Sequence, residues 1–180
     1  MRELKPSEAQ AFFSKLAKYV GTSVEDLITR EGGQFVFRII KNRVYYMSNE
    51  VERVAHPVAR KKLLGAGLLI GRFTHHGNFH IRITALPLLA MYAQYKVWLT
   101  PAAELSFLYK NDVMRSHIAR MSDGIPENAG IVVFSTDGQP IGFGVSTKAG
   151  VDALRSDPAS KIVIHQGDVG EYLRDQDTLF

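Results

Sequence analysis

The stretch KVWLTPAAELSFLYKNDVMRSHIAR, residues 96–120, decides how the second half of this chain is expected to fold. Residues alternate in character over Lys96–Leu99, with Trp98 opposite Val97 and Leu99, as in a strand with one buried face. Thr100-Pro101 then suits the N-cap and first position of a helix, which we expect to end at Asn111-Asp112. The stretch therefore predicts a helix followed by an extended segment.

The helix in this stretch and the cations around it allow two interpretations. We expect its packed face to carry the residues at helical spacing, namely Ala102, Leu105, Leu108 and Tyr109. A helix edged by Lys110, Arg115 and Arg120 could hold a polyanion. The same cations could instead be solvated side chains at a corner where the strand packs on the helix. The residues alone leave both interpretations open.

The rest of the second half predicts further short strands. Residues 131–135 and 140–146 frame a hairpin through Asp137-Gly138, and 161–166 is another apolar strand. Gly142 and Gly144 indicate a bulge or a close backbone approach in the returning strand. About five short strands and one helix in roughly 80 residues favour a small, partly closed β-barrel.

The first half predicts a mixed α/β domain with antiparallel hairpins. Ser7-x-x-Gln10 is a capping box for a helix that ends at Gly21. Residues 35–40 should pair with 44–48, and residues 68–74 with 79–85. We therefore expect an α+β chain with an N-terminal domain of residues 1–94 and a barrel of residues 95–180.

Composition limits the kind of protein this can be. Hydrophobic residues make up 46% of the 180, and charged residues 22%, which is typical of a folded domain. The absence of cysteine excludes disulfides and thiol catalysis. The charged N-terminus does not resemble a secretory signal, and the longest apolar run, residues 63–71, is too short to span a bilayer. We expect a soluble intracellular monomer that does not bind membranes.

Charge is distributed unevenly along the chain. Residues 1–94 carry 14 Lys/Arg against 7 Asp/Glu, a net charge of +7, whereas residues 95–180 carry 8 against 11, a net charge of −3. This asymmetry predicts two units with different surfaces. A polyanion site in the second half must therefore be a local cluster of cations.

No motif predicts catalysis, a metal or a cofactor. The glycine-rich run of residues 65–71 enters a strand and so has the wrong order for a dinucleotide loop. His75, His76 and His80 lack the further ligands of a coordination set and fit a polar turn. His165 lies in an apolar strand, where we expect a core histidine instead of a general base. We expect a protein without enzymatic activity.

Several segments together resemble one known family. From Lys96 onward, the order strand, helix, strand, hairpin, strand is similar to a PUA domain, the RNA-binding module named after pseudouridine synthases and archaeosine transglycosylases. Across the chain, six segments are similar to the eukaryotic nuclear-import-protein-seven family: LAKYVG (16–21), RVYYMS (43–48), TALPLLAMYAQYKVWL (84–99), ELSFLY (104–109), IGFGV (141–145) and HQGDVGEYLR (165–174).

The resemblance implies a non-enzymatic adaptor for assembly of the large (60S) ribosomal subunit, acting in the nucleus and nucleolus. It would bind single-stranded pre-rRNA, with U-rich sequence as a candidate, and take part in pre-rRNA processing. Family partners include an rRNA methyltransferase, nucleolar proteins and, in some lineages, an exosome subunit. By position, the resemblance assigns RNA binding to Lys110, Arg115, Arg120, Lys148, Arg155 and Lys161.

The chain departs from the family pattern at the expected RNA surface. Lys110, His117 and Ala119 stand where the family tends to have glycine, which lets an RNA backbone approach closely. The alternative is therefore a protein–protein scaffold whose PUA fold has lost most of its RNA affinity. A third interpretation, an accessory or inactive RNA-modification protein, has no recognisable catalytic domain to support it.

Overall fold

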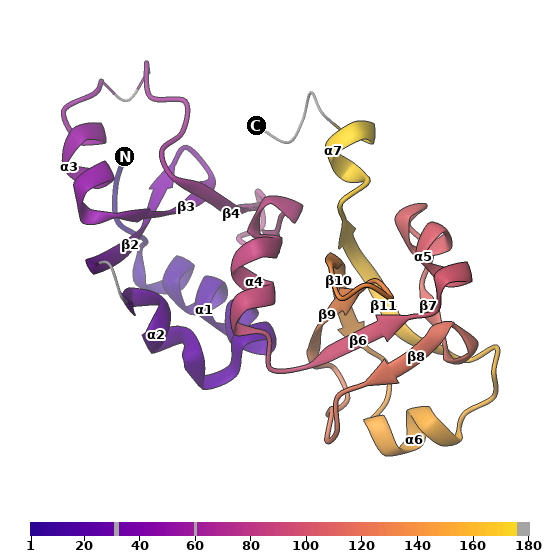
Figure 1. Cartoon of the computed structure of the whole chain (residues 1–180). Helices are drawn as coiled ribbons and strands as arrows, with labels where there is room; N and C mark the ends of the chain where they lie inside the picture. Colours follow the sequence, from indigo (N-terminus) through magenta and orange to yellow (C-terminus); the bar gives the residue numbers. More distant parts are fainter. Residues whose placement is uncertain (31–32, 60, 176–180) are drawn as a thin grey trace. The chain divides into compact units, whose positions relative to one another are not determined.

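The computed structural model describes residues 1–30, 33–59 and 61–175, which fall into two compact units (Figure 1). The N-terminal unit comprises Met1–Ala17 and Gly21–Ala85, and the C-terminal unit comprises Lys18–Val20 and Leu86–Phe180. Each unit combines helices with a largely antiparallel sheet, which confirms the expected α+β class. The domain boundary between residues 94 and 95 stays a prediction.

The N-terminal unit is built on a five-stranded antiparallel sheet. In spatial order its strands are β1 (Thr29–Arg30), β2 (Gly33–Ile40), β3 (Arg43–Ser48), β4 (Leu68–Phe73) and β5 (Phe79–Ile81). The helical elements are α1 (Pro6–Val20), η1 (Gly21–Ser23), α2 (Val24–Ile28), α3 (Asn49–Ala55) and η2 (Ile83–Ala85). Both predicted hairpins are present, although the last strand is shorter than expected because the 3₁₀ turn η2 replaces its end.

Aromatic packing joins helix α1 to this sheet. The ring of Phe12 lies 4.9 Å from that of Phe37 on β2 and 5.0 Å from that of Phe79 on β5. Both pairs are edge-to-face, the geometry that aromatic quadrupoles prefer. Phe12 therefore anchors the buried face of α1 on the sheet.

Helix α1 begins earlier than the sequence predicts. The N-cap is Lys5 and Pro6 is the first helical residue, so the expected capping box from Ser7 to Gln10 is wrong. The Glu8 carboxylate accepts the Lys5 N–H at 2.8 Å and pairs with Arg2 at 2.7 Å. The hydrogen bond from Arg2 holds the pKa of the Glu8 carboxyl at about 2. Proline fixes the first turn, and the third helical residue supplies the cap.

The C-terminal unit is a six-stranded sheet that curls into a nearly closed barrel. Its strands, in spatial order, are β7 (Val113–Met114), β11 (Lys161–Asp168), β10 (Pro140–Ser146), β9 (Gly130–Phe134), β6 (Lys96–Leu99) and β8 (Ile118–Met121). Only the 3₁₀ turn η3 (Arg115–His117) separates the two outer strands β7 and β8 along the chain. A three-residue link keeps these edges close, so the sheet must curve back on itself.

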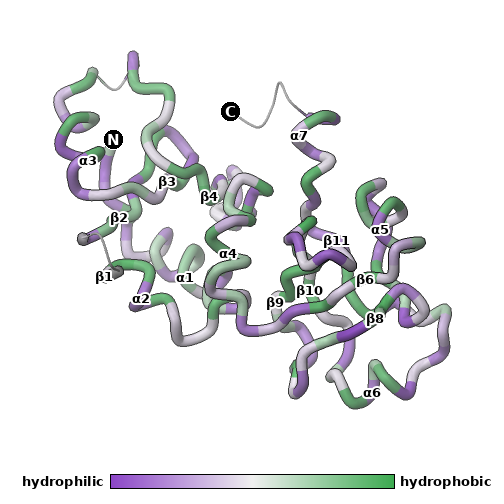
Figure 2. Tube along the Cα trace, in the orientation of Figure 1, coloured by the Kyte–Doolittle hydropathy of each residue, from purple (hydrophilic) through white to green (hydrophobic). Residues whose placement is uncertain are grey.

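Four helices accompany the barrel, and an apolar cluster fills it. Within the described residues the helices are α4 (Leu86–Tyr92), α5 (Pro101–Leu108), α6 (Gly150–Arg155) and α7 (Glu171–Arg174), of which α6 and α7 were not predicted. All five residues of β9 are buried, and Figure 2 shows hydrophobic residues along β9 and β10. Val97 and Leu99 are fully buried in this core, which confirms the alternation that leaves Trp98 outside it.

Two local predictions in the opening stretch are wrong. The packed face of α5 carries Ala103 and Phe107, and of the predicted residues only Leu108 packs against the core, whereas Leu105 and Tyr109 are 63% and 68% exposed. Several helical faces of this short segment contain apolar residues, so spacing alone could not choose between them. The segment after α5 is not one strand, because η3 must carry the chain from the β11 side of the sheet to the β6 side.

The two glycines of β10 allow a close backbone approach, as predicted. A Cβ at Gly142 or Gly144 would collide with a carbonyl oxygen of β11. The register between β10 and β11 also shifts at Phe143/Gly144. These glycines therefore let the barrel bend where two strands come closest.

Candidate nucleic-acid interface

Four of the six predicted RNA-binding cations lie around the segment 154–161 of the C-terminal unit. Arg115 donates its main-chain N–H to the Ser160 carbonyl at 2.8 Å and its Nε to the Leu154 carbonyl at 3.4 Å. Lys148 Nζ donates to Ser156 Oγ at 3.1 Å. The remaining two are Arg155, in the last turn of α6, and Lys161, which opens β11 beside β7. We call Arg115, Lys148, Arg155 and Lys161 the four-cation surface.

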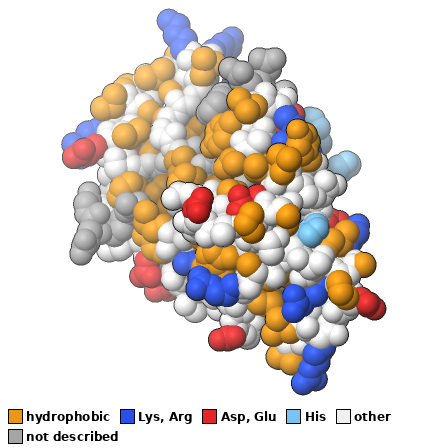
Figure 3. Space-filling model, turned by 45° about the vertical axis from the view of Figure 1, so that its right-hand side comes forward, with side chains coloured by type: hydrophobic (Ala, Val, Ile, Leu, Met, Phe, Trp, Pro, Cys, Tyr) orange, Lys and Arg blue, Asp and Glu red, His pale blue; other side chains and the backbone are white. Residues whose placement is uncertain are grey.

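Carboxylates lie among the cations of the four-cation surface and reduce its positive electrostatic potential. Lys161 Nζ lies 2.9 Å from the Asp112 carboxylate, and this hydrogen bond lowers the pKa of Asp112. Asp152 and Asp157 lie on α6 and in the loop after it. Four cations and three carboxylates leave a net charge of only +1. On the face of the molecule that Figure 3 shows, Lys and Arg side chains lie in separate groups, with Asp and Glu side chains near them.

Lys110 follows α5 in a left-handed backbone conformation. Its φ is +67°, which is unusual for a residue with a side chain, and its Nζ lies 3.2 Å from the Asp175 carboxylate. The described contacts therefore tie Lys110 to the segment after α7 and not to the four-cation surface. Glycine, which the resemblance places here, adopts this conformation without strain.

Arg120 occupies a third environment, on an aromatic ring. Its guanidinium carbon lies 3.7 Å from the centre of the Trp98 ring, and Trp98 in turn stacks on Phe134 at 5.5 Å. Ala119 and Arg120 line a hollow of about 370 Å³ beside this stack. The structure thus gives Lys110, Arg115 and Arg120 three separate sets of partners. Sequence alternation placed Trp98 outside the core but did not identify its partner.

His165 belongs to a hydrogen-bonded network around the buried Asp168 carboxylate, in agreement with its interpretation as a core histidine. Its Nε2 lies 2.7 Å from the fully buried Asp168 carboxylate, which also accepts Arg174 NH2 at 2.7 and 2.9 Å. Arg174 additionally donates to the Leu108 carbonyl at the end of α5. This network therefore joins α7 to β11 and α5.

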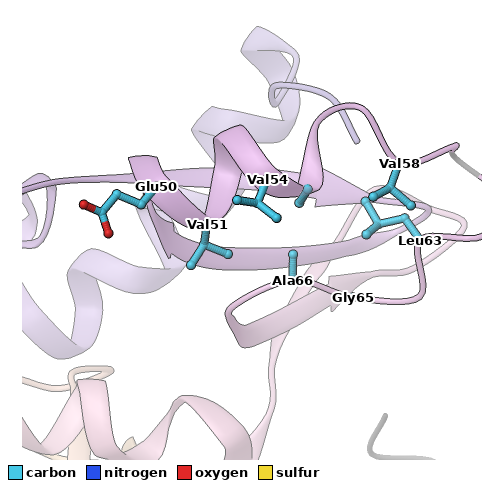
Figure 4. Close-up of a pocket in the computed structure, with 8 residues that line it drawn as sticks. Glu50, Val51, Val54, Val58, Leu63, Gly65 and Ala66 are labelled. Atoms are coloured by element: carbon cyan, nitrogen blue, oxygen red, sulfur yellow. The ribbon is translucent and has the colours of Figure 1, made fainter.

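A second surface feature, an apolar groove, lies in the N-terminal unit along α3 (Figure 4). Its volume is about 360 Å³, and its wall includes Val51, Val54 and Val58, spaced as one face of a helix. Val54 is 75% exposed. Exposed valines are weak helix formers, so helix propensity does not account for them. The sequence showed the helical spacing but not that this face is uncovered.

Neither a metal-ligand cluster nor a membrane-spanning helix is found among the described residues. No group of three or more His, Asp or Glu side chains among them could hold a metal ion. None of the helices within the described ranges is long and apolar enough to cross a membrane.

Comparisons with known proteins identify both parts of the chain. The model described as the NIP7/UPF0113 pre-PUA domain matches residues 1–83, and the UPF0113 PUA domain model matches residues 95–177. A conserved PUA domain protein from Thermoplasma acidophilum covers 97% of both chains at TM-score 0.56 and 16% identity. A hypothetical protein from Pyrococcus horikoshii OT3 covers 96% of both at TM-score 0.58 and 14% identity. The fold is that of a pre-PUA domain followed by a PUA domain.

The chain belongs to the NIP7/UPF0113 family, which confirms the family predicted from the sequence. The 60S ribosome subunit biogenesis protein NIP7 of Saccharomyces cerevisiae is 43% identical over 180 residues, 100% of this chain and 99% of that protein. The Dictyostelium discoideum homologue is 42% identical over 99% of this chain and 100% of its own length. The Xenopus laevis homologue is 43% identical over 99% of both.

Proposed function

We propose that this protein is a non-enzymatic, RNA-binding adaptor in biogenesis of the 60S ribosomal subunit, acting in the nucleus and nucleolus. Family membership and relatives named as 60S biogenesis proteins support the role in assembly. The PUA domain supports RNA as the ligand. Single-stranded pre-rRNA undergoing processing is the substrate that fits best, with other assembly factors, among them an rRNA methyltransferase, nucleolar proteins and an exosome subunit, as partners.

The observation that carries this proposal is the four-cation surface. Arg115 and Lys148 contact the segment 154–161, and Arg155 and Lys161 belong to it, although the unit as a whole is not basic. Phosphates are the anions that such a cluster would bind, and phosphate contacts position a nucleic acid without reading its sequence.

Binding through this surface should be weak and sensitive to salt. If three cations contact phosphates of a single strand, log affinity falls with log salt at a slope of about −2, since each contact contributes roughly 0.7. Affinity then drops somewhat more than about tenfold between 50 and 200 mM salt. Other contacts in the particle would reinforce such binding.

Titration of a U-rich oligonucleotide at several salt concentrations tests the proposal. The double variant Arg115→Gln with Arg155→Gln should make the slope of log affinity against log salt less negative by up to about 1.4, because two phosphate contacts are lost. A matched variant, Lys61→Gln with Lys62→Gln, removes the same charge from the N-terminal unit and should leave the slope unchanged. Absence of binding by the unaltered protein at low salt would disprove RNA binding.

A second candidate function is protein docking through the α3 groove. The groove is apolar apart from Glu50 on its wall; exposed Arg53 lies on α3, and exposed Lys61 and Lys62 directly precede the lining residue Leu63. An acidic amphipathic segment of an assembly factor fits these properties, because its apolar face would cover the valines and its carboxylates would meet these cations.

Recruitment to 60S precursor particles separates the two candidates. Val51→Asp with Val54→Asp should abolish cosedimentation with the particles if docking dominates, while oligonucleotide binding persists. In that case the Arg115/Arg155 variant would still cosediment. The reverse pattern would show that RNA contacts recruit the protein and would refute docking through this groove.

A further inference from the structure

The outer face of the barrel carries a ladder of stacked side chains across three strands. Arg120 on β8 is paired in register with Trp98 on β6, and Trp98 with Phe134 on β9. The guanidinium lies over the Trp98 ring, and the two rings are nearly parallel at 25°. Strand pairing therefore fixes the order guanidinium, indole, phenyl before any ligand arrives.

Arg120 is the exposed end of this ladder, and the N–H groups of its guanidinium are available to a ligand. Its side chain is exposed, and no residue within the described ranges accepts a hydrogen bond from its guanidinium. The planar guanidinium offers five N–H donors, and its face can stack on a flat ring. This is unlike Arg115, whose Nε donates to a carbonyl.

The hollow beside the ladder has the chemistry of a base site and not of a phosphate site. Trp98, Arg120 and the 136–138 turn line a space of about 370 Å³, within the range of small-ligand sites. Asp137 lies on its wall, and Glu104 holds Thr136 there through hydrogen bonds of 2.7 and 2.8 Å. Two carboxylates would repel a phosphate, whereas a carboxylate accepts hydrogen bonds from the N–H edge of a base.

We propose that this hollow binds one unpaired nucleobase, stacked on the open face of the Arg120 guanidinium, which Trp98 backs, with its N–H edge toward Asp137. Unpaired bases in RNA are commonly held by stacking on aromatic rings or guanidinium planes. The site deepens the RNA-binding function proposed above and rests on it. In this arrangement Arg120 contacts the base, and the four-cation surface contacts the phosphates.

Ala119 narrows the same hollow. It is exposed, lies next to Arg120 and lines the space, at a position where the family resemblance implies glycine. Its methyl group adds apolar surface beside the stacked base. Ala119→Gly should therefore weaken base binding slightly and leave phosphate contacts unaffected.

Trp98 is the only tryptophan of the chain, so its fluorescence reports this site directly. The full-length protein is titrated at low salt with an octauridylate and with the same oligonucleotide made abasic, which keeps the phosphates. The octauridylate should change the tryptophan emission and bind about 5- to 100-fold more tightly than its abasic counterpart, the effect of stacking one base.

Arg120→Lys separates stacking from charge, because lysine keeps the charge and loses the plane. We expect at least about fivefold weaker octauridylate binding, an unchanged salt slope and unchanged abasic binding. Arg155→Lys, the matched control on the four-cation surface, should change none of these. Circular dichroism checks that each variant is folded.

Three results would overturn the base site while RNA binding stands: octauridylate binding without a change in emission, equal affinity for the abasic oligonucleotide, or full affinity of Arg120→Lys. A different result, no binding of either oligonucleotide to the unaltered protein, would overturn the proposed function itself. The two failures are therefore distinguishable.

Discussion

Two aspartates of the C-terminal unit hold the same histidine, in very different surroundings. Asp112 accepts the main-chain N–H of His165 at 3.0 Å and binds Lys161, and its side chain is 23% exposed. Asp168 lies 2.7 Å from the ring Nε2 of His165 and binds Arg174, and it is fully buried. Both pairs consist of a carboxylate and a cation, so burial is the main difference between them.

Burial decides what such a pair does. Removing one partner of a buried pair leaves a charge without water or a counter-ion, so the pair functions as a structural tie. An exposed pair contributes little to stability, because water solvates both groups when it opens. Lys161 can therefore exchange Asp112 for a phosphate, whereas Arg174 has no comparable freedom.

The largest effect is expected at the buried pair. Asp168→Ala should lower the free energy of unfolding by about 3–5 kcal/mol, because it removes the counter-ion of Arg174 and the hydrogen-bond partner of the His165 ring beside the core. Urea unfolding followed by circular dichroism measures this. Asp123→Ala, an exposed control in the loop after β8, should change it by less than about 0.5 kcal/mol. Equal effects of the two variants would contradict the comparison.

At Lys110, backbone strain should outweigh the exposed ion pair. Lys110→Gly relieves the left-handed conformation at φ +67° and loses only the contact with Asp175. We expect the free energy of unfolding to rise by about 0.5 kcal/mol. Lys110→Ala, which loses the same contact but keeps the strain, is the control and should be no more stable than the unaltered protein.

The exposed aspartate should compete with RNA. Asp112→Asn keeps an acceptor for the His165 N–H and releases Lys161, so octauridylate affinity should rise about two- to fivefold at low salt. Because Lys161 lowers the pKa of Asp112, the carboxylate is ionised and competes at every pH near neutrality. Unchanged or weaker RNA binding would show that Lys161 does not contact phosphate.

The smallest effect is expected at the half-exposed pair Arg2–Glu8 of the N-terminal unit. The folded pKa of Glu8, about 2, is below its unfolded value, so the pair stabilises the fold above about pH 4.3 and loses this contribution as pH falls toward 2. Arg2→Ala should lower the free energy of unfolding by about 0.5 kcal/mol at pH 7. The difference should shrink when unfolding is measured at pH 3, whereas a constant difference would point to lost packing.

Periodicity predicted the strands and hairpins well, because alternation and turn residues act over a few neighbours. It predicted the burial of Val97 and Leu99 and the turn at Asp137-Gly138. It failed for the buried face of α5, because more than one face of this helix carries apolar residues. Contact with the barrel core decides that Phe107 lies on the buried face. Periodicity also missed α6 and α7, helices of six and four residues with little periodic signal.

The sequence by itself determined the family, the α+β class and the identity of the six candidate cations. Only the tertiary structure decided how those cations divide: four around the segment 154–161, Lys110 beside Asp175, and Arg120 on Trp98. The physical reason is that a charge is visible in the sequence, whereas its partners come from strands and turns far away along the chain. Those partners decide whether a cation is free for phosphate, tied to a carboxylate or held flat on a ring.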